Sequence, residues 1–208
     1  MWEYLVAVIA APVQALREVA EKKLWKQGLL LVAVLALLNA AVSLATANAV
    51  SPGVSDPEYT KLLANLYTPA VYLTFILMTT VLSWFLSGAI YYGFSKLFKG
   101  VGTLAGMLAG LGFAMTPYLL SVPLSALALL LGRTSASLVG GVAGFVAGLW
   151  ILALNVLAIR ESQQLGTGQA IGVILLTIAA FFVLIFIIGA LIAIIVAIAA
   201  LMSGSIPS

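Results

Sequence analysis

The sequence predicts an all-α, polytopic integral membrane protein with five transmembrane helices and an N-terminal amphipathic helix at the membrane interface. Of its 208 residues, 64% are apolar and only 7% are charged, and the mean hydropathy is +1.24. An average soluble domain carries about 25% charged residues. So few charges cannot cover the surface of a soluble fold of this length, and the composition excludes disordered and nucleic-acid-binding chains. The lipid bilayer is therefore the first predicted partner, and nucleic acid is not one.

The N-terminal segment, residues 1–26, is predicted to lie on the membrane surface rather than to span the membrane. Pro12 suits the start of a helix, and the residues that follow alternate with helical periodicity between an apolar and a polar face. The apolar face has Val13, Leu16, Ala20 and Leu24, and the polar face has Gln14, Arg17, Glu18, Glu21 and Lys22. Two interpretations stay open: an interfacial or partner-docking helix, with Trp2 and Trp25 at headgroup level, or a solvated lead-in to the first span.

A single transmembrane domain, residues 27–202, is predicted to follow, with a flexible tail over 203–208. A bilayer core about 30 Å thick needs roughly 20 helical residues. Long uncharged windows predict spans over 28–47, 69–94, 103–131, 137–159 and 170–201. The run from Phe181 to Ile188 is apolar throughout, whereas the strands of a membrane β-barrel alternate between polar and apolar residues.

Two of these spans are predicted to be irregular. Pro117 and Pro123 each remove a helical hydrogen bond, so the third span is expected to be kinked or locally unwound between Met115 and Pro123. The last apolar stretch of about 32 residues would be roughly 48 Å long as one helix, which exceeds one membrane thickness. It is predicted to form one long, tilted helix, with a break near Gly189 as the alternative.

The positions of the basic residues predict the orientation. With five spans, the N-terminal segment and the loops after the second and fourth spans share one side of the membrane. That side carries seven of the nine Lys and Arg residues: Arg17, Lys22, Lys23, Lys26, Lys96, Lys99 and Arg160. The other side carries Lys61 and Arg133. The positive-inside rule then predicts a cell (inner, cytoplasmic) membrane protein with a cytoplasmic N-terminus and the C-terminus outside.

Two glycine series predict close packing between helices. They are Gly102, Gly106 and Gly110, and Gly140, Gly144 and Gly148, each with a spacing of four residues. Such small faces allow helix backbones to approach closely within lipid. Packing inside the monomer and homodimerisation are both consistent with this pattern.

A few polar groups lie within the predicted spans. The amides of Asn39 and Asn155 and the hydroxyl of Thr116 are expected to form hydrogen bonds between spans. Together with the breaks at Pro117 and Pro123 they form the candidate polar cavity or kink. This set carries the alternative function, a channel or transporter for a neutral or lipidic solute.

The sequence offers no catalytic constellation. It contains no His and no Cys, and its six acidic residues are placed in loops, at helix ends or in the N-terminal segment. We therefore predict no catalytic residue, no metal site, no cofactor and no enzymatic activity. Gly166, Thr167 and Gly168 lack the GxxxxGK[ST] pattern of a phosphate loop, so they are interpreted as a turn in which Thr167 caps the last helix.

Four stretches of the chain resemble the Yip domain family, the Ypt/Rab-interacting proteins. They are residues 12–20 leading to Trp25; Tyr92–Phe94 through Phe98–Gly100; Gly112–Tyr118; and Leu157–Glu161 followed by Leu165–Ala170. The last stretch is the most specific, and it defines a predicted cytoplasmic linker with Arg160, Glu161, Gly166, Thr167 and Gly168. The resemblance extends over nearly the whole chain because the four stretches occur in the family's order and spacing.

The resemblance implies five spans, a cytoplasmic N-terminus and a non-enzymatic role. Eukaryotic relatives act in vesicle traffic with Rab-type GTPases. This sequence lacks their long polar N-terminal region, which disfavours a Rab-type GTPase as partner and implies a prokaryotic member. We therefore expect a membrane-organising or partner-binding subunit, trafficking-like or accessory to a transporter. Its expected partners are a second copy of itself or another membrane protein such as a transporter.

Overall fold

The computed structural model describes residues 1–47, 68–128, 130 and 132–202. Its helices are α1 (Trp2–Ala10), α2 (Pro12–Glu21), α3 (Trp25–Ala47), α5 (Pro69–Leu97), α6 (Leu104–Ala114), α7 (Tyr118–Ala128), α8 (Arg133–Gln163) and α9 (Thr167–Met202). Five helical stretches of this described part are long and apolar enough to cross a membrane: α3, α5, α6 with α7, α8 and α9. The predicted all-α class with five membrane-spanning helices is thus confirmed.

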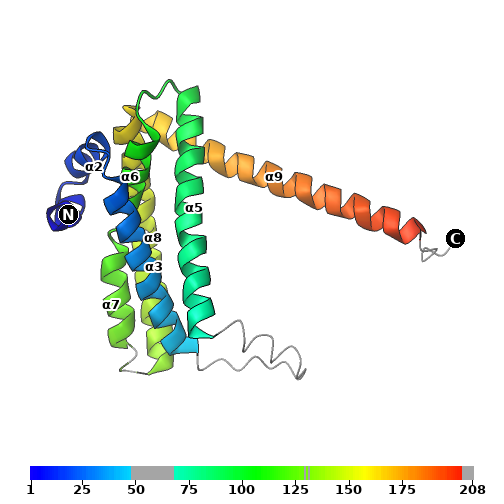
Figure 1. Cartoon of the computed structure of the whole chain (residues 1–208), viewed down its shortest axis with the longest axis horizontal. Coiled ribbons are helices and arrows are strands. Elements are labelled where there is room, and N and C mark those ends of the chain that lie inside the picture. Colours follow the sequence, from blue (N-terminus) through cyan, green and yellow to red (C-terminus); the bar gives the residue numbers. More distant parts are fainter. Residues whose placement is uncertain (48–67, 129, 131, 203–208) are drawn as a thin grey trace.

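Helix α6 forms the centre of the bundle. It packs against α3, α5 and α8, and every residue from Gly106 to Ala114 is buried. Figure 1 shows α3, α5 and α8 running alongside α6 and α7, which follow one another along the bundle. The core around α6 contains the fully buried Met107 and Phe113, together with Leu154 of α8.

The third span is interrupted between α6 and α7, within the predicted region. Backbone bonds of the i→i−3 type replace α-helical ones from Met115 to Leu120. Pro117 has no N–H to donate, and its ring would clash with the carbonyl of Phe113 in a regular helix. Pro123, in contrast, lies inside α7, so the unwound part of the third span does not extend to Pro123.

The boundaries of the last two spans differ from the predicted ones. α8 extends beyond residues 137–159 at both ends, which places Arg160 and Glu161 in its last turn and leaves residues 164–166 as the linker. α9 passes through Gly189 as one helix, so the one-helix prediction is confirmed and the break is wrong. The predicted tail 203–208 and the loop with Lys61 lie outside the described residues.

The N-terminal segment forms a pair of short helices that covers one end of the bundle. α2 begins at Pro12 as predicted and buries Ala15, Leu16, Val19 and Ala20. It packs against α6 and α8, so protein covers its apolar face and the segment is not a solvated lead-in. Its predicted position at the membrane interface stays a prediction. We call this end of the bundle, formed by α2, residues 98–103 and the linker 164–166, the basic end.

Helix α9 follows a course of its own. Its first turns pack against α5 and α8, with Ala170, Val173 and Ile174 buried. Beyond them α9 runs out sideways from the bundle (Figure 1), and every residue from Ile178 to Ala199 is exposed. α9 is the most apolar of the candidate spans, and no described residue of the chain covers the larger part of its surface.

Candidate functional site

The polar residues predicted to line a cavity lie away from the pocket described below. Asn39 is exposed and donates to the carbonyl of Leu35 in its own helix at 2.9 Å. Thr116 is buried and donates to the carbonyl of Phe113 one turn earlier. Asn155 is half-buried on α8. None of them, and neither Pro117 nor Pro123, lines the pocket described below.

The two glycine series lie in different surroundings. A Cβ on Gly102 would overlap the carbonyl of Ser162, and one on Gly106 or Gly110 would lie about 3 Å from Ala20 or Ala158. This series therefore touches α2 and α8. In the second series Gly140 faces Ser125 of α7, whereas a Cβ on Gly144 or Gly148 would meet no described atom within 4 Å.

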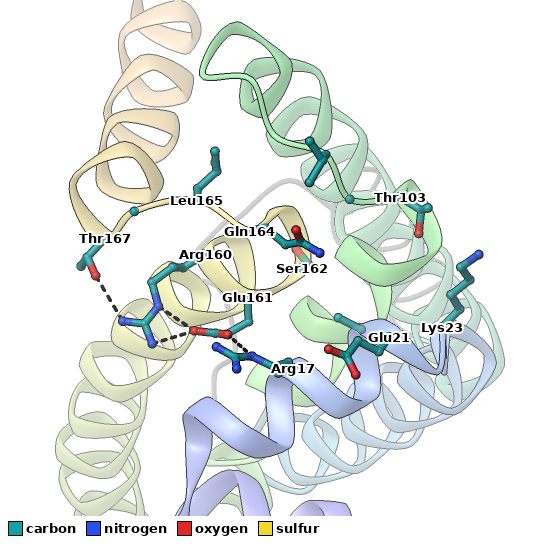
Figure 2. A pocket seen from close by; sticks show the side chains of 14 residues that line it. Arg17, Glu21, Lys23, Thr103, Arg160, Glu161, Ser162, Gln164, Leu165 and Thr167 are labelled. Atoms are coloured by element: carbon teal, nitrogen blue, oxygen red, sulfur yellow. Dashed lines mark hydrogen bonds and ion pairs between the residues drawn. The ribbon is translucent and has the colours of Figure 1, made fainter.

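A pocket of about 750 Å³ opens at the basic end of the bundle. Four segments that are distant in the sequence enclose it: the end of α2, residues 101–103, the last turn of α8, and the linker with the start of α9 (Figure 2). Its charged lining residues are Arg17, Glu21, Lys23, Arg160 and Glu161. The predicted linker residues Arg160, Glu161, Gly166 and Thr167 are thus brought together here, and Gly168 follows directly.

Glu161 is the buried charge of this pocket. Its side chain is only 5% exposed, and both carboxylate oxygens are paired with arginines. Arg17 Nε donates to Oε2 at 2.8 Å, and Arg160 Nε donates to Oε1 at 2.7 Å. Figure 2 shows the two guanidinium groups on either side of the carboxylate. The Arg17 pair joins α2 to the last turn of α8, and both pairs compensate for the desolvation of the carboxylate.

A buried glutamine joins the α5–α6 loop to α8. Gln163 is fully buried. Its backbone carbonyl accepts a hydrogen bond from the N–H of Val101 at 3.1 Å. Its side-chain Nε2 donates to the carbonyl of Thr103 at 3.3 Å. Ser95 donates to its Oε1 at 3.2 Å. Sequence reasoning missed this residue, because a glutamine at a helix end gives no signal of burial before its distant partners are known.

The turn before α9 is built differently from the prediction. The Thr167 hydroxyl accepts from Arg160 Nη1 at 3.1 Å, while the N–H of Gly166 donates to Gln169 Oε1 at 2.9 Å. The cap therefore comes from a glutamine that reaches back, and Thr167 holds Arg160 instead. The expectation that Thr167 caps the helix is corrected by this geometry.

Lys22 and Tyr4 connect the two N-terminal helices outside the pocket. Lys22 Nζ donates to Tyr4 Oη at 2.6 Å and to Glu18 Oε2 at 3.1 Å. The hydrogen bond to Tyr4, followed by that to Glu18, raises the pKa of Lys22 above its usual value. Because a raised lysine pKa favours the protonated form, this contact is fully present at neutral pH and is lost only above the lysine's ordinary range.

The lining offers charge and hydrogen-bond donors rather than a reactive group. Arginine, lysine, threonine and serine side chains surround a space large enough for a small polar group, with no imidazole or thiol anywhere in the chain. Such a lining can hold an anion or a partner's carboxylate.

The comparisons with known proteins identify one family. A family model described as Yip1 domain matches residues 6–188. No curated protein and no solved structure matches the chain. The matched range contains α2, the pocket-lining segments and the first turns of α9.

Proposed function

Because this chain belongs to the Yip1 domain family and is a multi-pass membrane protein, we propose that it is a non-enzymatic subunit that binds a partner membrane protein. The partner is either a second copy of the chain or a different protein, such as a transporter that it accompanies. The basic end would face the cytoplasm of the cell, and with α9 crossing the bilayer the C-terminus would lie on the opposite side.

The single observation that supports this proposal is the uncovered surface of α9. A soluble protein would bury an apolar helix of this length, whereas in a membrane it is covered either by lipid or by another transmembrane helix. α9 has bulky apolar side chains all around, including Phe181, Phe182 and Phe186, each at least 60% exposed. Van der Waals packing drives the association of such helices in lipid.

The orientation rests on the charges of the bundle. The helix ends that meet at the basic end carry seven of the nine Lys and Arg residues, and Arg133 begins α8 at the other end (Figure 1). Cytoplasmic loops of membrane proteins carry such an excess of Lys and Arg.

Site-specific photo-crosslinking in the native membrane tests the proposal. A benzophenone side chain replaces Phe186 on α9, and in matched variants it replaces Phe75 on α5 or Phe145 on α8. These three phenylalanines are 77%, 63% and 68% exposed, respectively. They therefore present similar reactive surfaces on three different helices.

We expect a defined protein adduct from position 186 that positions 75 and 145 do not give. An adduct of twice the chain mass identifies self-association, and another defined mass identifies a different partner. The proposal fails if α9 reacts with lipid alone, or if all three positions give the same protein adducts. The transport alternative gains no support, because Asn39, Thr116 and Asn155 do not meet at the pocket.

A further inference from the structure

We propose that the pocket at the basic end binds a phosphate-bearing anion. The partner-binding role of α9 does not use this pocket, and the two proposals stand on different residues. The pocket occupies about 750 Å³ between the ends of α2 and α8, the start of α6 and the start of α9. It is thus a built cavity between four segments rather than a patch on one helix.

The buried carboxylate does not oppose an incoming anion. Glu161 is 5% exposed, and both of its oxygens are already occupied by Arg17 and Arg160. Three cationic side chains and two carboxylates line the pocket, which leaves one net positive charge. The second carboxylate, Glu21, is exposed, so water screens it more than it screens Glu161.

Donors remain free for a ligand on both sides of the pocket. Arg17 uses Nε for Glu161, and its two Nη atoms make no hydrogen bond within the described part of the chain. Lys23 follows α2 with a left-handed backbone (φ 51°), and its Nζ has no bond among the described residues. In Figure 2, Lys23 lies on one side of the pocket, and Arg17 and Arg160 lie together on another side around Glu161. Arg17 and Lys23 line the same pocket, and a guanidinium and an ammonium group can each donate charge-assisted hydrogen bonds to a phosphate.

Two helices begin at this pocket and add to its positive potential. α6 starts directly after Thr103, and α9 starts at Thr167, and both threonines line the cavity. The N-terminal end of a helix carries a partial positive charge and favours anions. The side chain of Thr103 accepts from Gly106 N, so α6 contributes its dipole rather than that hydroxyl.

The position of the pocket at the ends of apolar helices would bring it to the level of lipid headgroups. The segments around it end or begin apolar helices that cross the membrane, and basic pockets between transmembrane helices bind anionic headgroups. The phosphate could belong to an anionic phospholipid or to a free phosphate, and the experiment separates these sources.

The test uses the full chain, purified in a neutral mild detergent, and measures thermal stability against added ligand. The three ligands are dioctanoyl phosphatidylglycerol, dioctanoyl phosphatidylcholine and inorganic phosphate. We expect phosphatidylglycerol to raise the Tm in a saturable, salt-sensitive manner, whereas the net-neutral phosphatidylcholine does not. An equal effect of inorganic phosphate would identify free phosphate as sufficient.

Two lysine variants decide whether this pocket is the site. Lys23→Gln removes a pocket cation, and Lys99→Gln removes a lysine of the basic end outside the pocket. Both lysines are exposed and have positive φ, 51° and 63°, so the backbone strain is matched. We expect Lys23→Gln to weaken phosphatidylglycerol binding about fivefold and Lys99→Gln to leave it unchanged. The proposal is overturned if neither anion stabilises the chain, if phosphatidylcholine acts equally, or if both variants lose affinity alike.

Discussion

Glu161 is a buried charge that joins two helices at the basic end. Its carboxylate is taken out of water and held by Arg17 from α2 and Arg160 from its own helix, at 2.8 and 2.7 Å. A buried charge is tolerated only while its partners stay in place. The Arg17–Glu161 pair therefore adds a charged contact between α2 and the end of α8 to the packing of these two helices.

Replacing Arg17 by Gln should destabilise the protein. The variant leaves Glu161 with Arg160 as its only charged partner, and a hydrogen bond to a charged group contributes about 1.5–3 kcal/mol. Because the Arg17 side chain is 60% exposed, we expect the lower part of that range or less, about 1 kcal/mol. Thermal unfolding in mild detergent measures the change.

The matched control for this variant is Lys22→Gln. Lys22 forms an ion pair with Glu18 and a hydrogen bond with Tyr4, but the side chains of the ion pair are more than 50% exposed, and exposed pairs contribute little. The control should lower the melting temperature less than Arg17→Gln does. Equal losses in the two variants would mean that the burial of Glu161 has no energetic consequence.

The residues of the pocket were only partly predictable from the sequence. Arg160 and Glu161 are neighbours, and the resemblance places them in one linker. Arg17 lies 144 residues away from Glu161 and is visible in the sequence only as part of a polar helix face. Helical periodicity indicates which residues share a face, but it does not indicate which distant helix end that face will meet.

At the scale of elements, the crossing of α3 and α6 depends on two glycines that the spacing argument passed over. A Cβ on Gly112 would lie 2.6 Å from the Cα of Gly28. The backbones of the two helices are therefore in contact at this point, and only hydrogen atoms fit between them. This crossing positions α6, and with it the start of α6 at the pocket.

Replacing Gly112 by Ala should separate α3 from α6. The added methyl group would meet the backbone of Gly28 in α3, which cannot move aside as a flexible side chain can. We therefore expect a loss of about 1–3 kcal/mol in the free energy of unfolding. The matched variant Gly144→Ala adds a methyl group that meets no described atom, and alanine favours a helix over glycine. It should leave thermal stability equal or slightly higher; a similar loss in both variants would contradict the assigned crossing.

The prediction of single elements succeeded where one residue determines the backbone locally. Pro12 begins α2, and Pro117 interrupts the third span. Pro123 shows the limit of that rule, because α7 continues through it. α1 was not predicted as a separate helix. Nearly all of its residues are apolar, so the sequence shows no polar face with helical periodicity. In the structure α1 packs Leu5 and Val8 against the core.

At the scale of the whole molecule, five spans were predictable because charges are scarce and interrupt the apolar sequence at regular distances. The course of α9 was not predictable in this way. A uniformly apolar helix has no face that indicates its neighbours, and the contacts of α9 are limited to its first turns. The uncovered remainder is the feature from which the proposed partner binding follows.

The distance between α5 and α9 in lipid tests this central claim most directly. Gly172, near the start of α9, lies against Phe98, directly after the end of α5. Ile192 and Met78 each lie 20 residues, or about 30 Å of helix, away from this point. If α9 packed antiparallel along α5, these two residues would therefore lie opposite each other. The chain has no cysteine, so spin labels can be attached to Met78→Cys and Ile192→Cys in nanodiscs. We predict a label separation well beyond the about 10 Å between packed helices. A narrow distribution at packing distance would show that the chain covers α9 itself, and it would contradict the account.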